Sequence, residues 1–559
     1  MVLQECAEAA VLVPVLAPVA ALILIVVATL AALRLANRRS TNDKARNAGL
    51  FLNFVAILGF ALIVPDAADL SFALGRDATA SGFLVGFFMA SSAVGSMCVF
   101  AIVVRRPAAL LDLSRRLLLL ASTAAIAGAS LYFVVASRTP RRARETGLAT
   151  AAVVELEQLQ LLISRRRRWV YLIASRALLG FGHGIGAYTI DLSFTRLTKV
   201  AERPRQSLRF YLAVTLGIGC GPLVSALAHM LETATSEMLA CGGGGETKSS
   251  GRLDATAFVS VAALQVVLSI SAFIAVVCVF PHMSDAVDYQ RDDEDEDEDD
   301  HAMVVKVEQC EEDGERSDDA EPRGEPTERD GVAVVRDSVH GCGANVAVIV
   351  GGLLCVAIRS FCVSSLEVGS ALLLEVKYGW STTRIGVAIG FVFLNIIPAK
   401  GCHSLFGSRF KLVTWVRTFA FVAIPASLLL TSRACDVFSV ALLHGGGNTA
   451  DDRTCAALLL IGDALIFPAI YLSNSLSNGL MMQHVLPDGA LFDATKVTLM
   501  NKVIGNGVGR FLGPWLARAQ IQHAGQNSYG LQQLFLAISF FITFETLMVQ
   551  GSKCLFARR

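Results

Sequence analysis

The chain contains 559 residues, of which 54% are hydrophobic and only 17% are charged, and its formal net charge is zero. A water-soluble globular protein of this length carries more charge, so the composition excludes a soluble enzyme and indicates a polytopic membrane protein. The basic residues gather in short loops between apolar segments, a pattern that sets membrane topology. We therefore expect a lipid bilayer as the surroundings of the chain and no nucleic acid as a partner.

The first apolar run covers residues 9–33, and an acidic flank precedes it whereas a basic flank follows it. This order of charges places the amino terminus outside and residues 34–46 in the cytosol. We expect an uncleaved extra helix here rather than a cleaved signal peptide. The sequence is compatible with the plasma membrane and with a vacuolar or lysosomal membrane.

Beyond residue 48, about twelve further apolar segments reach the roughly 20 residues that a membrane-spanning helix needs. They fall into two sets of six, so the expected fold class is an all-α polytopic membrane protein. The expected spans are 49–74, 80–104, 117–137, 169–191, 208–231, 256–280, 345–373, 383–402, 411–431, 455–474, 496–517 and 530–550.

The two sets are separated by a stretch that begins with an acidic run at 292–300 and has too few apolar residues to fold. The expected domains are the extra helix with a basic cytosolic segment (1–48), a first six-helix bundle (49–280), an acidic disordered cytosolic linker (281–343), a second six-helix bundle (344–551) and a basic tail (552–559).

The two halves resemble each other in sequence. Residues 74–87 align with 378–391, and the stretch Gly217-Ile-Gly-Cys-Gly221-Pro222 matches Gly509-Arg-Phe-Leu-Gly513-Pro514. Each match falls at the corresponding place in its half. A duplicated six-helix unit accounts for this pattern.

The short loops set the orientation of the spans. Placing the basic loops 105–116, 192–206 and 400–411 in the cytosol obeys the positive-inside bias. The basic loop 138–168 then faces the opposite side. We treat it as a tolerated exception, with 147–163 lying on the membrane surface as a short helix; the alternative is that the third and fourth spans are misplaced.

Glycines recur in the segment RALLGFGHGIG, residues 176–186. They stand at every second position, which would weaken a soluble helix but in lipid lets another backbone approach closely. The segment therefore predicts tightly packed, moving helices. The glycines are Gly180, Gly182, Gly184 and Gly186.

From residue 49 to 551 the chain resembles the major facilitator superfamily. Arg176 with Gly180 is similar to the fourth-helix signature of that family, and Gly217, Gly221 and Pro222 are similar to its fifth-helix signature. The loop after the second helix departs from the family pattern. The resemblance implies two six-helix bundles around a central cavity that opens alternately to each side of the membrane.

Within the superfamily, segments such as IVPDAADLSFALG and GNGVGRFLGP look most like one branch. It contains the SPX-associated vacuolar phosphate transporters and the lysosomal ceroid-lipofuscinosis membrane protein. No SPX domain precedes the helices, and this resemblance does not fix a substrate.

An ionisable side chain inside hydrocarbon costs about 2.5 to 3.5 kcal/mol on insertion scales, so each should face a partner or a cavity. Asp66 follows Pro65, and this proline is able to kink the helix and leave a carboxylate for a coupling proton or cation. The alternative is that Asp66 lies at the water interface and starts a loop.

Two further candidates stand on the fourth span. Arg176 and His183 lie seven residues apart, nearly on one helix face. Arg176 is able to bind an anion or pair with a carboxylate, and His183 is able to titrate near neutral pH. The alternatives are a structural ion pair and a satisfied interior imidazole.

The second half contributes Arg359 and Glu367 on the seventh span and Arg510 on the eleventh. Its arginines, with Arg176, would give a cavity a positive lining suited to an anion. The alternative for Arg510 is a structural ion pair with Asp463 or Glu545.

Cys435 and Cys455 fall in one non-cytosolic loop and are able to form a disulfide if that side is oxidising. No cofactor, metal site or enzyme activity is expected, since the chain has no Walker-type nucleotide motif and no His, Asp or Glu cluster with metal-ligand spacing.

These features favour a secondary-active transporter that moves a small molecule or ion by alternating access, with a proton-coupled anion as the preferred case. The expected state is a monomer in the bilayer. An anion channel on the same fold and a transport-inactive receptor or scaffold are the alternatives.

Overall fold

The computed structural model describes most of the chain, and almost every described residue is helical. The amino-terminal extra helix and the basic tail that the sequence predicts lie outside the described residues. The described residues are 41–106, 109–139, 154–196, 198, 203–242, 257–281, 330–442, 452–486 and 491–551.

The first half of the fold runs from residue 41 to 281. Its helices are long because uninterrupted apolar sequence keeps every backbone hydrogen bond inside the segment. They are α2 (Thr41–Ala61), α3 (Ala67–Ala73), α4 (Ala78–Arg105), α5 (Ala109–Ser137), α6 (Val154–Arg196), α7 (Arg203–Gly242) and α8 (Ala257–Cys278).

The second half runs from residue 330 to 551. It contains a short 3₁₀ turn, η4, and two π-helical stretches, η5 and η6, inside otherwise α-helical spans. Its elements are α10 (Asp330–Val376), α11 (Thr382–Leu394), α12 (Ile396–Phe406), η4 (Gly407–Arg409), α13 (Leu412–Leu428), α14 (Ser432–Leu442), α15 (Asp452–Gln483), α16 (Ala494–Asn501), η5 (Lys502–Gly509), α17 (Arg510–Thr543) and η6 (Phe544–Val549).

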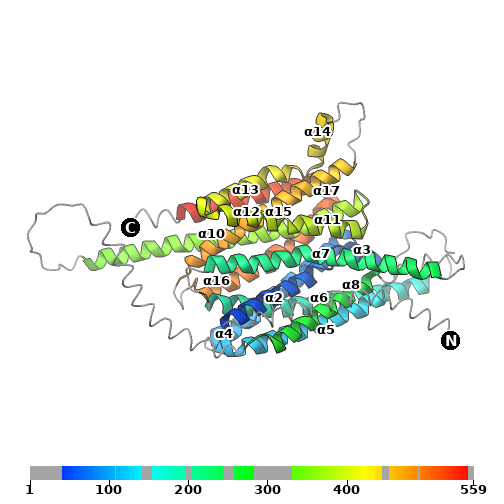
Figure 1. Cartoon of the computed structure of the whole chain (residues 1–559), viewed down its shortest axis with the longest axis horizontal. Helices are drawn as coiled ribbons and strands as arrows, with labels where there is room; N and C mark the ends of the chain where they lie inside the picture. The colour runs from blue at the N-terminus through cyan, green and yellow to red at the C-terminus, as the bar shows by residue number, and fades with distance from the viewer. Residues whose placement is uncertain are drawn as a thin grey trace, which may run out of the picture.

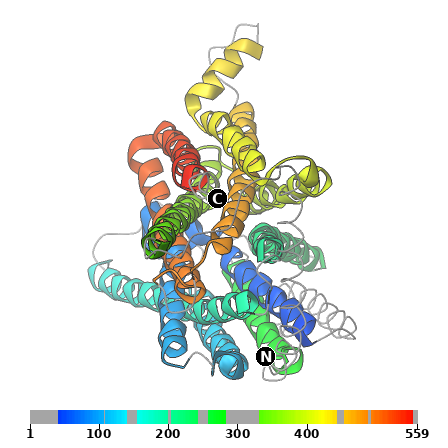
Figure 2. The ribbon, with the colours of Figure 1, turned by 90° about the vertical axis from the view of Figure 1, so that its left-hand side faces the viewer.

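The long helices run side by side along the longest axis of the molecule (Figure 1). Apart from their ends and short breaks, all the expected spans coincide with helical residues. Within the described residues, eight helical stretches are long and apolar enough to cross a membrane, or nine if the bent pair α13 and α14 counts as one. Viewed along the helices, the two halves occupy opposite sides of the molecule (Figure 2). The expected all-α polytopic fold is thus confirmed.

Glycine contacts repeat in both halves. A Cβ atom added to Gly217 would lie 2.9 Å from the Phe54 carbonyl oxygen of α2, and one added to Gly509 would lie 3.0 Å from the Ala357 carbonyl oxygen of α10. Gly221 and Gly513 face the same two neighbours one turn later. Each glycine-proline helix therefore packs backbone to backbone on the first helix of its own half, as expected for a duplicated unit.

The glycines of α6 face two neighbours in alternation. Gly180 and Gly184 lie against backbone carbonyls of α4, whereas Gly182 lies against the Ala121 carbonyl oxygen of α5. Side chains larger than hydrogen have no room there. The predicted close packing of this segment is confirmed.

The basic region 138–168 differs in part from expectation. Helix α6 is continuous from Val154, so residues 154–163 extend the spanning helix and do not form a separate surface helix. Extending an existing helix avoids the cost of a new nucleus. The Arg168 Nη1 group donates to the Arg138 carbonyl oxygen at 2.6 Å, and Arg76 lies 5.6 Å from the Trp169 ring. This region is therefore at the same end as the loop after α3, as the tolerated exception requires.

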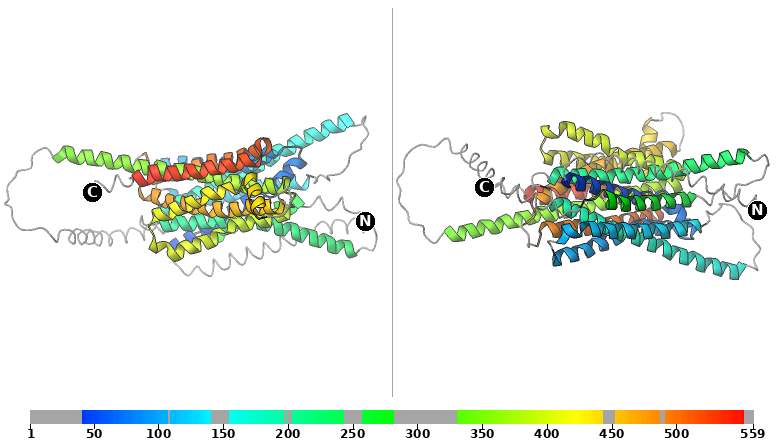
Figure 3. Two further views of the ribbon diagram at one scale, coloured as in Figure 1. Left: turned by 90° about the horizontal axis from the view of Figure 1, so that it is seen from above. Right: turned by 60° about the horizontal axis from the view of Figure 1, so that its bottom comes forward.

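The expected linker 281–343 also needs correction at its end. Helix α10 already begins at Asp330, so its first turns, which project from one end of the bundle (Figure 3), continue the helix that contains the seventh span, Asn345–Val376. Here too, extending an existing helix avoids the cost of a new nucleus. Residues 282–329 lie outside the described residues.

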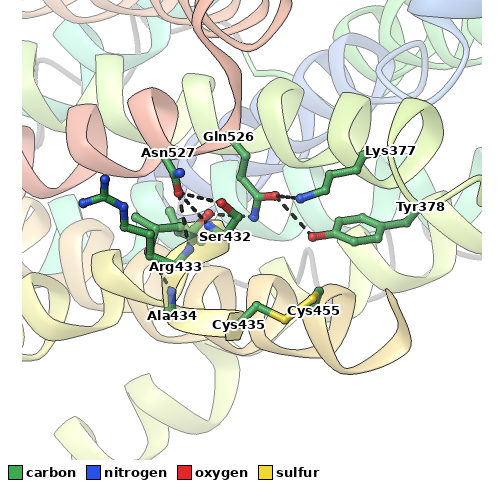
Figure 4. Close-up of a disulfide and its surroundings, with 11 residues drawn as sticks. Lys377, Tyr378, Ser432, Arg433, Ala434, Cys435, Cys455, Gln526 and Asn527 are labelled. Atoms are coloured by element: carbon green, nitrogen blue, oxygen red, sulfur yellow. Dashed lines mark hydrogen bonds between the residues drawn. A yellow bond between two sulfur atoms is a disulfide. The ribbon is translucent and has the colours of Figure 1, made fainter. Parts of the chain in front are cut away.

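Cys435 of α14 and Cys455 of α15 form a disulfide with a Cα–Cα distance of 5.2 Å. Helix α14 is bent by 79° from α13, and Figure 1 shows it pointing away from the bundle. Asn527 binds the first turn of α14, because the Asn527 Oδ1 atom accepts a hydrogen bond from the backbone N–H of Ser432 at 2.9 Å (Figure 4). The end of the bundle with this bond is called the disulfide end below.

Candidate functional site

Arg359 lies at the interface of the two halves, against two tyrosine rings that also contact each other. Its guanidinium carbon is 5.2 Å from the centre of the Tyr471 ring of α15 and 5.5 Å from that of the Tyr211 ring of α7. The side chain is only 4% exposed, and its Nε atom has no hydrogen-bond partner among the described residues. The two rings attract the Arg359 guanidinium through cation–π interactions. Its Nε–H group remains able to donate to another acceptor.

Two amide side chains of the second half, Asn474 and Asn501, interact with Tyr211. The Asn501 Nδ2 atom donates to the Asn478 Oδ1 atom at 2.9 Å. Asn474, on the turn of α15 after Tyr471, is fully buried, and its amide makes no hydrogen bond of ordinary geometry to a described residue. A buried unsatisfied amide is costly unless water or a ligand completes it.

Arg510 and Glu367 form a second buried group beside the interface. The Arg510 Nη2 atom lies 3.8 Å from the Glu367 Oε1 atom, and both side chains are nearly inaccessible. The expectation that Arg510 pairs with Asp463 or Glu545 is wrong, because Glu545 is instead bound by Arg417 at 2.5 Å and the nearest carboxylate to Arg510 is Glu367. Helix rotation, which the sequence does not specify, decides this pairing.

Arg176 is fully buried in the first half, with its guanidinium carbon 4.9 Å from the Phe88 ring and 5.8 Å from the Phe60 ring. None of its three side-chain nitrogen atoms has a hydrogen-bond partner among the described residues. The ring of His183 also stacks on Phe88, at 5.4 Å. The two residues therefore share one helix face, as predicted.

His183 lines a separate cavity of about 70 Å³ inside the first half. Asn53 and Gln265 line the same cavity, and each has one side-chain atom without a hydrogen-bond partner in the described structure. His183 is still within electrostatic reach of Lys502 and Arg510. It thus lies between the first-half interior and the charged centre.

Asp66 lies in the break between α2 and α3, next to Pro65. It is only 2% exposed, so the alternative of a loop residue at the water interface is wrong. Its Oδ1 atom is 2.9 Å from the Nε2 atom of His229, and its Oδ2 atom accepts from Ser225 at 3.2 Å. His229 was not among the predicted site residues, although this residue is ionisable and falls within the expected span 208–231.

Contacts between the halves close both ends of the bundle. At the disulfide end, Thr382 donates to the Asp69 carboxylate at 3.1 Å and Thr79 donates to Gln522 at 3.0 Å. At the opposite end, the Lys502 ammonium lies 2.9 Å from the Asp191 carboxylate. The two halves are therefore joined near both ends of the bundle.

The described residues form a polytopic membrane fold of two helical halves, with buried charged side chains where the halves meet. The profile of the Major Facilitator Superfamily matches residues 49–485, so the chain belongs to that superfamily. Its members are transmembrane transporters, and the superfamily resemblance of the sequence is confirmed.

Solved structures show the same fold. The xylose transporter XylE from E. coli, in a partially occluded inward-open conformation, superposes with a TM-score of 0.55 at 11% identity, covering 91% of this chain and 98% of that one. A D-xylose-proton symporter gives a TM-score of 0.50 at 12% identity, covering 90% and 98%. No curated protein matches the sequence.

Proposed function

We propose that this protein is a secondary-active transporter that carries a small anion across the membrane with proton coupling. The two halves rock around the buried charged side chains where they meet, so that the anion site faces each side in turn. The observation that carries this proposal is Arg359, held on Tyr211 and Tyr471 from opposite halves. Because Arg359 contacts both halves, an anion that binds to it would change the contacts between them.

The balance of charge supports an anion over a cation or a neutral solute. Arg359 has no carboxylate within ion-pair distance in the described structure, and Arg510 is only partly neutralised by Glu367 at 3.8 Å. Lys502 is paired with Asp191. An excess of buried positive charge is expensive unless an anion completes it. Asn474 and Asn478 would then donate to anion oxygens.

We assign the other candidate residues as follows. Arg176 would contact the anion in a second conformation of the cycle, since its guanidinium lacks a hydrogen-bonded partner in this one. Asp66 would hold the coupling proton. The disulfide supports placing its end on the non-cytosolic side, because such bonds persist in oxidising compartments.

The test is uptake of radiolabelled inorganic phosphate, sulfate, small carboxylates, sugars and amino acids into proteoliposomes, with and without a pH gradient. Phosphate is included because the segments named above resemble the branch of SPX-associated phosphate transporters. Arg359→Gln should raise KM for the transported anion at least about tenfold, since a charge-assisted hydrogen bond contributes roughly 1.5 to 3 kcal/mol. Arg433→Gln, an exposed arginine on α14, is the matched control.

The alternatives give different results in the same assay. Flux that does not saturate with anion concentration would favour a channel. Well-folded protein that moves no solute would favour a receptor or scaffold. Unchanged KM in Arg359→Gln would remove Arg359 from the site.

A further inference from the structure

Three ionisable side chains lie in a row inside the first half, joined by one contact of hydrogen-bond length and one longer contact. The His229 Nε2 atom lies 2.9 Å from Asp66 Oδ1, and its Nδ1 atom lies 3.9 Å from Glu232 Oε2. His229 and Glu232 are one turn apart on α7, and Asp66 comes from the break between α2 and α3. We call these three residues the relay row.

The row is buried, with Asp66, His229 and Glu232 2%, 7% and 5% exposed. Hydroxyl groups complete it at both ends: Ser225 donates to Asp66 at 3.2 Å and Ser260 of α8 donates to Glu232 at 3.5 Å.

Other titratable groups face the row from neighbouring helices. Asp66 is within electrostatic reach of Tyr132 on α5 and of Glu375 on α10, and Arg176 acts on the same Tyr132. The row therefore has a carboxyl group at each end.

An imidazole between two carboxylates has two protonation patterns. The neutral ring carries one N–H and serves only one carboxylate, whereas the imidazolium presents an N–H to each. The Nδ1 contact with Glu232, at 3.9 Å, has to shorten before it becomes a hydrogen bond. The two nitrogen atoms thus face different acceptors. This is the arrangement that lets one ring receive a proton on one side and release a proton on the other.

The row also has a direction. From Asp66 it leads along α7 towards Gly242, at the disulfide end of the bundle (Figure 1). The same helix carries Tyr211, which packs on Arg359. Helix α7 therefore connects the row to the tyrosine that contacts Arg359.

We infer that His229 relays the coupling proton between Asp66 and Glu232, which gives the first half a proton path to the disulfide end apart from the anion centre. The inference rests on the proposed proton coupling. Protonated Asp66 gives its proton to Nε2 of a neutral ring whose hydrogen is on Nδ1, and the imidazolium then releases the Nδ1 proton to the Glu232 carboxylate. The net step moves one proton from Asp66 to Glu232 and leaves the neutral ring with its hydrogen on Nε2, so the ring has to exchange its tautomer before it accepts the next proton from Asp66.

The first test needs no substrate. Purified protein with isotope-labelled histidine is studied by solid-state NMR over about pH 5 to 8, the range in which histidine charge changes. The signal of His229 is identified by its loss in His229→Gln. We expect the proton-loaded intermediate of the relay, with protons on both ring nitrogens, in the wild type at neutral pH, and a ring with a proton on one nitrogen in Glu232→Gln. A neutral ring that does not respond to Glu232→Gln overturns the inference and leaves the anion proposal untouched.

The second test separates coupling from transport, with inorganic phosphate as the probe. His229→Gln and Glu232→Gln should lose phosphate accumulation driven by a pH gradient by about tenfold or more, the lower range of a proton-transfer group. Phosphate exchange at equal pH should stay within about twofold of the wild type, since exchange moves no net proton. His403→Gln, a partly buried histidine on α12, is the control.

Full gradient-driven uptake in the folded variants contradicts the relay, and so does loss of exchange together with accumulation. If the wild type moves no phosphate, the proposed function fails for this anion, and the NMR result alone decides the protonation of the row.

Discussion

Gly82 of α4 lies directly against Pro514 of α17: a Cβ atom at Gly82 would be 2.5 Å from the Pro514 carbonyl oxygen. Its sequence counterpart Gly386 of α11 meets the Pro222 carbonyl oxygen of α7 in the same way, at 2.7 Å. The two contacts join the halves on both sides of the centre. They are related by the internal duplication, and both must separate and re-form if the halves rock.

Gly82→Val should impair closure of this interface. The added methyl groups meet backbone that has no room to move, and overpacking of this kind costs about 1 to 3 kcal/mol. Because the cost falls on the closed state alone, we expect transport to fall about tenfold while the protein still folds. Uptake and thermal unfolding should be measured together.

Gly401→Val is the matched control for this prediction. Gly401 also lies in a helix, α12, but an added Cβ atom would meet nothing within 4 Å. The prediction fails if both glycine variants transport equally well, or if Gly82→Val only unfolds.

The disulfide between Cys435 and Cys455 should stabilise the second half. It closes a loop with a sequence separation of 20, and loop-closure entropy gives about 3 kcal/mol for a loop of this size. We expect reduction to lower the midpoint of thermal unfolding. Cys435→Ser should start from the lower midpoint and show no response to reductant; a response in that variant would mean that the reductant acts elsewhere.

The pair of Arg510 and Glu367 should behave as a coupled unit. Glu367→Gln leaves the Arg510 charge buried without its nearest carboxylate, and breaking a buried pair on one side costs about 3 kcal/mol or more. The double variant Glu367→Gln with Arg510→Gln should be less destabilised than either single variant. Additive effects in this double-mutant cycle, measured by denaturant unfolding, would show that the 3.8 Å contact is energetically unimportant.

His484, just beyond the end of α15, should make stability depend on pH. Its Nδ1 atom lies 2.9 Å from Asn345 Oδ1 of α10. Partial burial lowers the pKa of His484 below its ordinary value of 6.5, because the charged ring loses water. The unfolded state then binds the proton more readily, so the contribution is complete above about pH 6.5 and declines as pH falls below it.

We therefore expect the thermal midpoint to fall on acidification from about pH 7.5 to 5.5, across the ordinary histidine range, and His484→Gln to reduce that fall. The comparison should be made in one detergent at constant ionic strength. An identical pH profile in the variant would assign the dependence to other groups.

Much of the architecture was predictable from the sequence. The spans follow from runs of apolar residues, and the glycine pairs Gly217 with Gly221 and Gly509 with Gly513 identify where helices touch. These features depend on residues close together in the chain. The continuation of α6 to Val154 and of α10 to Asp330 was not predictable, because polar flanks do not show whether a helix continues beyond the membrane.

The candidate site was predictable only as a set of residues. Arg176, Arg359, Arg510 and Glu367 stand out because charge inside hydrocarbon is rare. The same criterion applies to His229, which lies in an expected span, and Glu232 is one turn further on. Tyr471, which contacts Arg359, and Asn474, one turn further along α15, could not be singled out in this way, since neutral polar residues are common in these helices.

The sequence by itself determined that this protein spans the membrane, is duplicated and carries a few buried charges, because composition and repetition are properties of the chain. Only the tertiary structure decided which charges meet. Arg510 faces Glu367, Asp66 faces His229, and Arg359 faces two tyrosines from opposite halves. A helix that is apolar all round has no periodic stripe to fix its rotation, so the direction of each polar side chain is set by packing against its neighbours.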